Sequence, residues 1–180
     1  FVDVVVTYWH RNNQQIGYSD DQFRLWRSAP NPNPFRGEPD YSSRIFVDET
    51  GPAGLDGLGG VGWIWQPSWT DVDRDGFPDL HINVELDEDL LLLNQGDGTF
   101  GPNIATTIGM NYNGPAPQPG GAWGHEMGKG LSDFDNDGDL DFLLTNPGSG
   151  LSSKKDAFYR NDSDLSEGGS GLAFTYIGES

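Results

Sequence analysis

Short apolar runs recur along the whole chain, and each is bounded by glycine, proline, asparagine or aspartate. Runs of about four to eight residues between turn-forming residues are typical of β-strands. No segment shows a helical period of apolar residues with capping residues at its ends. The pattern therefore predicts an all-β protein.

The predicted strands recur in a fixed order of four short segments. One set comprises residues 62–69, 80–84, 89–94 and 98–100, and a second comprises 127–131, 142–145, 156–161 and 172–177. Residues 1–6, 21–26 and 44–48 fit the second, third and fourth places of a further set. The chain is therefore expected to hold roughly two and three-quarter repeats, with units at residues 1–60, 61–126 and 127–180.

Aspartates with one spacing, D-x-D-x-D-G-x-x-D, lie between the first two strands of both complete repeats, 62 residues apart. Carboxylates at alternate positions converge only where the chain curls, and they then repel one another unless a hard cation lies among them. The glycine permits the necessary turn. Ligation by oxygen alone indicates Ca²⁺, so two calcium sites are predicted. Their expected ligands are Asp71, Asp73, Asp75, the Phe77 carbonyl and Asp79, and then Asp133, Asp135, Asp137, the Asp139 carbonyl and Asp141.

The loop differs from an EF-hand, which places a bidentate glutamate at position twelve between two helices. Position twelve is Ile82 in the first loop and Leu144 in the second. The alternative interpretation is a solvated acidic turn, which two full copies of the motif disfavour.

The charge of the chain agrees with cation binding. There are 28 acidic against 10 basic residues, a formal net charge of −18, and nine aspartates lie in the two loops. Two bound Ca²⁺ would leave about −14, so nucleic acid and anionic membranes are poor partners. No run of apolar residues is long enough to span a membrane.

The two loops resemble a known repeat. D-V-D-R-D-G-F-P-D-L and D-F-D-N-D-G-D-L-D-F, followed by N-Q-G-D-G-T-F and F-Y-R-N, are similar to FG-GAP (VCBS) repeats of integrin alpha chains and of cartilage acidic protein-like proteins. The resemblance covers most of residues 44–177. The chain departs from the family pattern in two respects. The first repeat lacks its loop, and there are long insertions at 10–20, 28–43 and 103–126.

The resemblance implies a partial β-propeller over residues 1–180, built from blades of four antiparallel strands. Each calcium loop would join the first and second strands of its blade. Fewer than three blades cannot close a ring. The chain is therefore expected to be part of a longer propeller or to be completed by another chain.

Three groups of other residues leave alternatives open. Trp63, Trp65 and Trp69 alternate before the first loop, where they would pack between blades or stack on sugar rings. Tyr8 to Arg11 would form a turn or a contact surface, and the pair His125 and Glu126 a structural feature or an acid–base pair.

The functional expectation is a non-catalytic, calcium-stabilised interaction module in an extracellular or periplasmic setting, whose partners are proteins or further blades. The alternatives are a glycan-binding, lectin-like propeller and the non-catalytic part of a polysaccharide-acting enzyme. The partner surface is expected opposite the calcium loops, on segments 10–20, 49–62, 103–126 and 146–155, with Trp9, Tyr112 and Trp123 as anchors. The alternative is that these segments only pack against neighbouring blades.

Overall fold

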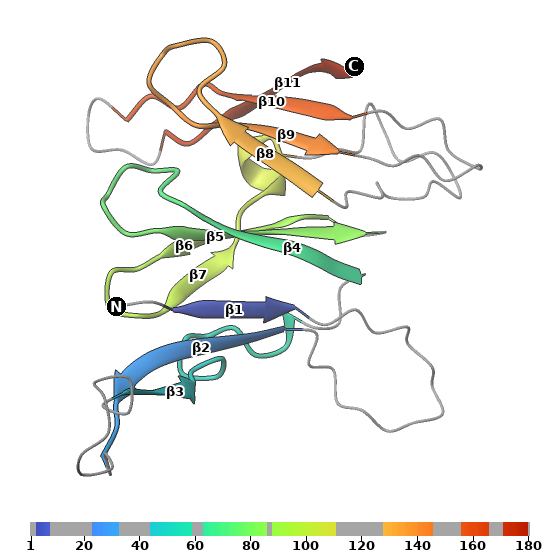
Figure 1. The fold of residues 1–180 in the computed structure, drawn as a ribbon. Helices are drawn as coiled ribbons and strands as arrows, with labels where there is room; N and C mark the ends of the chain where they lie inside the picture. The colour runs from blue at the N-terminus through green and yellow to red at the C-terminus, as the bar shows by residue number, and fades with distance from the viewer. Residues whose placement is uncertain are drawn as a thin grey trace.

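The protein is all-β. The computed structural model describes residues 3–7, 23–32, 44–58, 63–85, 88–110, 128–145, 156–165 and 171–179. These residues form three antiparallel sheets of three or four strands, which are stacked on one another in chain order and do not close into a ring (Figure 1). The segment η3 (Thr106–Ile108) forms a single turn of 3₁₀ helix.

Each sheet is a meander in which every strand pairs with the next one in sequence. The first contains β1 (Val4–Thr7), β2 (Phe23–Pro30) and β3 (Arg44–Asp48). The second contains β4 (Trp63–Thr70), β5 (Asp79–Glu85), β6 (Leu90–Asn94) and β7 (Phe100–Asn103). The third contains β8 (Gly128–Ser132), β9 (Asp141–Thr145), β10 (Ala157–Asn161) and β11 (Phe174–Glu179).

Every predicted strand is present, and each sheet falls inside one of the three expected repeat units. The boundaries differ most at β2, which ends at Pro30, four residues later than predicted, and β7 and β11 each begin two residues later than predicted, at Phe100 and Phe174. The residues before Phe100 belong to a turn in which Asp97 accepts hydrogen bonds from the backbone and side chain of Thr99. Local side-chain bonds of this kind end the strand ladder.

The middle sheet is buried on both faces. Leu90 and Leu92 of β6 belong to the apolar cluster shared with the first sheet, which includes Phe23 and Leu25. Leu91 belongs to the cluster shared with the third sheet. Because side chains alternate along a strand, the uninterrupted run of leucines supplies both interfaces.

The segments that link the sheets contribute to the same clusters. Ala53 and Leu55 lie in the first interface, and Ala105 and Met110 lie in the second. The described parts of the segments expected to carry a partner surface thus contribute buried residues to the interfaces between sheets, while other residues of the same parts are exposed. The expected anchors Trp9, Tyr112 and Trp123 lie outside the described residues. The described part of the chain contains no helix long and apolar enough to cross a membrane.

Candidate metal centres

The loop between β4 and β5 curls around its own aspartates. Asp71 Oδ2 accepts a hydrogen bond from the backbone N–H of Gly76 at 3.1 Å, and Asp73 Oδ1 accepts one from Asp75 N–H at 3.2 Å. Arg74 and Gly76 have positive φ angles of 58° and 91°. Glycine adopts such a conformation without strain, whereas the arginine is held there by the loop.

The loop between β8 and β9 repeats this geometry. Gly138 N–H donates to Asp133 Oδ2 at 3.1 Å, and Asn136 and Gly138 have φ angles of 62° and 98°. Asp139 N–H donates to Asp137 Oδ1 at 2.9 Å, just as Phe77 N–H donates to Asp75 Oδ1 at 2.8 Å. Two sequences that share only the motif positions therefore adopt one loop conformation.

The last aspartate ties each loop to its sheet. Asp79 is fully buried and accepts hydrogen bonds from Val72 N–H at 2.9 Å and from Asn94 N–H at 2.8 Å. Asp141 is likewise buried, and its donors are Phe134 N–H and Asn161 N–H, at 2.9 and 2.8 Å. The final aspartate thus orders the loop in addition to supplying a carboxylate.

An asparagine at the end of the third strand of each complete sheet closes the loop from outside. Asn94 Nδ2 donates to the Pro78 carbonyl at 3.0 Å, and Asn161 Nδ2 donates to the Leu140 carbonyl at 3.4 Å. No role for these two asparagines was predicted from the sequence. The feature of the sequence that could have indicated this role is that both predicted third strands end in asparagine. Asn161 also begins the sequence Asn161-Asp162-Ser163, which satisfies the N-x-S pattern of N-glycosylation, but its side chain belongs to this buried structure and is 2% exposed.

Three carboxylates converge in each loop. Oxygen atoms of Asp71, Asp73 and Asp79 lie within 4.8 Å of one another, and the same holds for those of Asp133, Asp135 and Asp141. Asp75 and Asp137, which were also predicted to be ligands, are not part of these groups of converging carboxylates. One oxygen of each accepts the backbone hydrogen bond described above, which leaves the second oxygen for a cation.

The electrostatics of the first loop disfavour three bare carboxylates. Burial, opposed by hydrogen bonds from Asn94 and Val72, raises the pKa of Asp79 to about 6. Burial also raises the pKa of Asp73, and the carboxylates of Asp75 and Asp71 add to that effect. Asp71 Oδ1 is buried and lacks a hydrogen-bond donor among the described residues. An orphaned carboxylate oxygen beside two others fits a site for a hard cation.

The second loop has the same character. Burial raises the pKa of Asp135, and the nearby Asp137 and Asp141 act in the same direction. Arg160 Nε lies 3.8 Å from Asp135 Oδ2 and opposes this shift, but the guanidinium makes its shorter contact with Asp162, at 2.7 Å.

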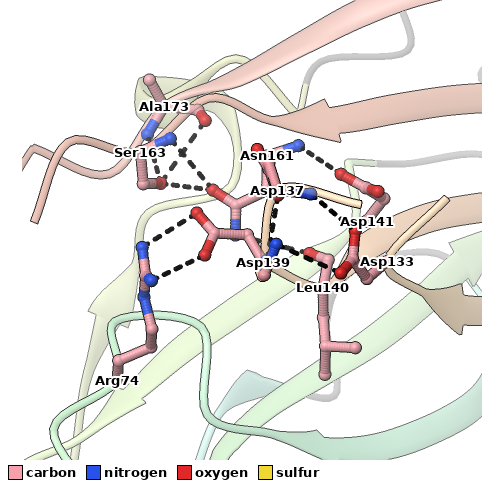
Figure 2. A network of polar contacts seen from close by, with 10 residues as sticks. Arg74, Asp133, Asp137, Asp139, Leu140, Asp141, Asn161, Ser163 and Ala173 are labelled. Carbon is pink, nitrogen blue, oxygen red and sulfur yellow. Dashed lines mark hydrogen bonds and ion pairs between the residues drawn. The ribbon is translucent and has the colours of Figure 1, made fainter. Parts of the chain in front are cut away.

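A salt bridge joins the two loops directly (Figure 2). Arg74 lies between two expected ligands of the first loop and reaches across to Asp139 in the second, with Nη1–Oδ1 and Nη2–Oδ2 distances of 2.8 and 2.9 Å. The Asp139 carboxylate is nearly buried, whereas half of the Arg74 side chain is exposed. Burial raises the pKa of Asp139, and Arg74 opposes this shift. The bridge thus connects the loops of neighbouring sheets.

A second polar cluster lies in the same sheet–sheet interface. Lys129 Nζ of β8 lies 2.5 Å from His81 Nδ1 and donates to the His81 carbonyl at 3.0 Å. His81 Nε2 lies 3.4 Å from Asp89 Oδ2. Burial lowers the pKa of His81 to about 4, with Lys129 acting in the same direction. Because His81 is fully buried, no substrate can reach its ring, and the cluster fits a packing role.

The tryptophans that precede the first loop differ in how far they are buried. Trp65 is partly buried, as a packing role predicts, but Trp69 is 36% exposed and lies against Phe100 with ring centroids 6.0 Å apart. The buried-core interpretation therefore does not hold for Trp69. The side chain of Trp63 lies outside the described part of the chain, as do Tyr8 to Arg11, His125 and Glu126.

Comparison with known proteins adds no family: no protein-family model and no curated protein matches this chain.

Proposed function

We propose that the chain is a calcium-stabilised segment of a β-propeller of the FG-GAP type. In this proposal it has no catalytic role and acts as an interaction module outside the cytoplasm. The observation that carries the proposal is the duplicated loop, which gathers three carboxylates in two sheets through the same backbone hydrogen bonds. A surface selected only for solubility has no need for this duplication.

The proposed ligands in the first loop are the carboxylates of Asp71, Asp73, Asp75 and Asp79 with the carbonyl of Phe77. In the second loop they are the carboxylates of Asp133, Asp135, Asp137 and Asp141 with the carbonyl of Asp139. This all-oxygen donor set suits Ca²⁺, which accepts six to eight oxygen ligands in a flexible arrangement. Mg²⁺ demands stricter octahedral geometry and retains more water.

Thermal melts with EDTA, with Ca²⁺ and with Mg²⁺ test the proposal. A ligand that binds only the folded state stabilises it by about 3 kcal/mol per site at a hundredfold excess over Kd. We expect a rise in Tm of several degrees in Ca²⁺ relative to EDTA, and a smaller rise in Mg²⁺. Equal melting temperatures in all three conditions would reject the proposal.

Glycan binding is the second candidate, and the exposed ring of Trp69 is the observation that favours it. Aromatic rings stack on the apolar faces of sugars. Tryptophan fluorescence of the wild-type chain and of Trp69→Ala during titration with oligosaccharides tests this candidate. A saturable change that Trp69→Ala abolishes is expected for a glycan site, and the absence of any change in the wild-type chain removes this candidate.

A further inference from the structure

The first sheet presents one apolar face away from the other two described sheets. Leu25 of β2 packs against the middle sheet, so its neighbour Trp26, and Val4, which pairs with Trp26, point to the opposite side. Phe46 of β3 shares that side. Val4 is 36% exposed and Phe46 is 56% exposed. We call this surface, formed by Val4, Val6, Trp26 and Phe46, the head face.

The third sheet presents a second apolar face at the other end of the stack (Figure 1). Phe142 and Tyr159 pack against the middle sheet, so Leu143 and Phe158, which pair across β9 and β10, point away from it. Phe134 lies edge-on to Phe158, with ring centroids 5.8 Å apart, and is 38% exposed. We call this surface, formed by Phe134, Leu143 and Phe158, the tail face.

Strand register relates the head face to surfaces that are buried elsewhere in the molecule. The pairs Val4–Trp26, Leu80–Leu92 and Phe142–Tyr159 are equivalent. In each sheet, the residue that follows the second member of the pair by two positions is itself paired with a phenylalanine of the last strand. Val4, Val6, Trp26 and Phe46 therefore occupy the positions of Leu80, Ile82, Leu92 and Phe100. The middle sheet buries those four side chains against the sheet before it.

The tail face has the same relation to the opposite surface of the middle sheet. Phe134, Leu143 and Phe158 occupy the positions of Val72, His81 and Leu91. These three side chains are all buried where the middle sheet meets the third. At both interfaces between neighbouring sheets within the molecule, a surface of the tail type thus covers a surface of the head type.

We propose that the tail face of one molecule packs on the head face of a second copy of this chain. Each copy carries one face of each type, so two copies satisfy both faces through two equivalent head-to-tail contacts. A heterologous contact of this kind forms a ring when its rotation closes. Three sheets from each copy make a six-bladed ring, within the range of about four to eight blades found in propellers.

Sedimentation of charged variants tests this arrangement. The wild-type chain should sediment as a dimer. Phe46→Asp places a charge on the head face and Phe158→Asp places one on the tail face, so each should sediment as a monomer. Gln95→Asp adds the same charge in an exposed turn of the middle sheet and should remain dimeric. A dimer that persists in either face variant alone would indicate head-to-head or tail-to-tail packing and overturn the proposal.

Cross-linking provides a test that does not depend on charged substitutions. His81 and Phe142 meet across an internal junction with ring centroids 4.8 Å apart, and their equivalents on the two free faces are Leu143 and Val4. The chain has no cysteine. The double variant Val4→Cys/Leu143→Cys should therefore give a covalent dimer with a short bifunctional maleimide, whereas each single variant should give none. A wild-type monomer at all concentrations, or equal cross-linking in the single variants, would overturn the proposal.

Discussion

The aspartates of a metal loop differ in how much they contribute to the structure of the loop. Asp79 accepts two backbone N–H groups from inside the sheet and is fully buried. Asp75 is exposed and accepts one N–H group, from Phe77. A buried donor that loses its acceptor costs about 1–3 kcal/mol, and an exposed one turns to water. Substitution of Asp79 therefore tests the structure of the loop, whereas substitution of Asp75 tests the binding of the ion.

Substitution of Asp79 by alanine should destabilise the fold even without calcium. Two donors lose their acceptor, so we expect a loss of about 2–5 kcal/mol in the free energy of unfolding measured with urea in EDTA. Asp75→Ala should change that value by less than about 1 kcal/mol in EDTA. It should, however, lose much of the stabilisation that Ca²⁺ adds. Equal losses for both variants in EDTA would contradict this division of roles.

The Arg74–Asp139 bridge should contribute modestly to stability. Half of the arginine side chain is exposed, which screens the pair, although bidentate geometry helps it. A double-mutant cycle with Arg74→Ala and Asp139→Ala should give a coupling energy of about 0.5–1 kcal/mol. Gln95→Ala is a suitable exposed control in place of Arg74. A coupling energy near zero would mean that the loops are positioned by the sheets alone.

At the scale of elements, most of the strands could be predicted from short apolar runs and from the turn-forming residues that bound them. The strands could be located because apolar runs end at glycine, proline, asparagine or aspartate, and the metal loops because their spacing is strictly repeated. The bridge from Arg74 to Asp139 spans 65 residues, and the contact from His81 to Lys129 spans 48. Such contacts arise where two sheets pack, and no local pattern specifies which side chains meet there.

The cluster of Lys129, His81 and Asp89 should make stability depend on pH. Burial lowers the pKa of Lys129 to about 7 from the ordinary 10.5, with Asp89 opposing the shift. Between these values the unfolded chain binds the proton more strongly, so the free energy of unfolding should rise as pH increases from about 7 to 10. One group gives a slope of at most about 1.4 kcal/mol per pH unit.

Lys129→Met tests this assignment because methionine keeps the apolar stem without the charge. Urea unfolding in saturating Ca²⁺ should show the rise with pH for the wild-type chain and a flatter profile for the variant. The pKa of Asp79, about 6, lies below this range, so that carboxylate contributes little to the slope. A parallel slope in both proteins would assign the pH dependence to other groups.

At the scale of the whole molecule, stability is shared between neighbouring sheets. The middle sheet buries both faces and each end sheet buries one. Such stacking makes each repeat depend on its neighbours. The order of the sheets could be predicted from the repeat, whereas the packing of linkers such as 49–58 and 103–110 between them could not. Those linkers lack periodicity and contribute single buried residues such as Ala53 and Met110.

Calcium stoichiometry tests the central claim most directly. Titration of the metal-free chain by calorimetry should give two Ca²⁺ per wild-type chain. Asp75→Ala and Asp137→Ala should each bind one, because their loops belong to different sheets and share no ligand. The double variant should bind none. A wild-type chain that binds no Ca²⁺ would contradict the account, and so would a single variant that loses both ions.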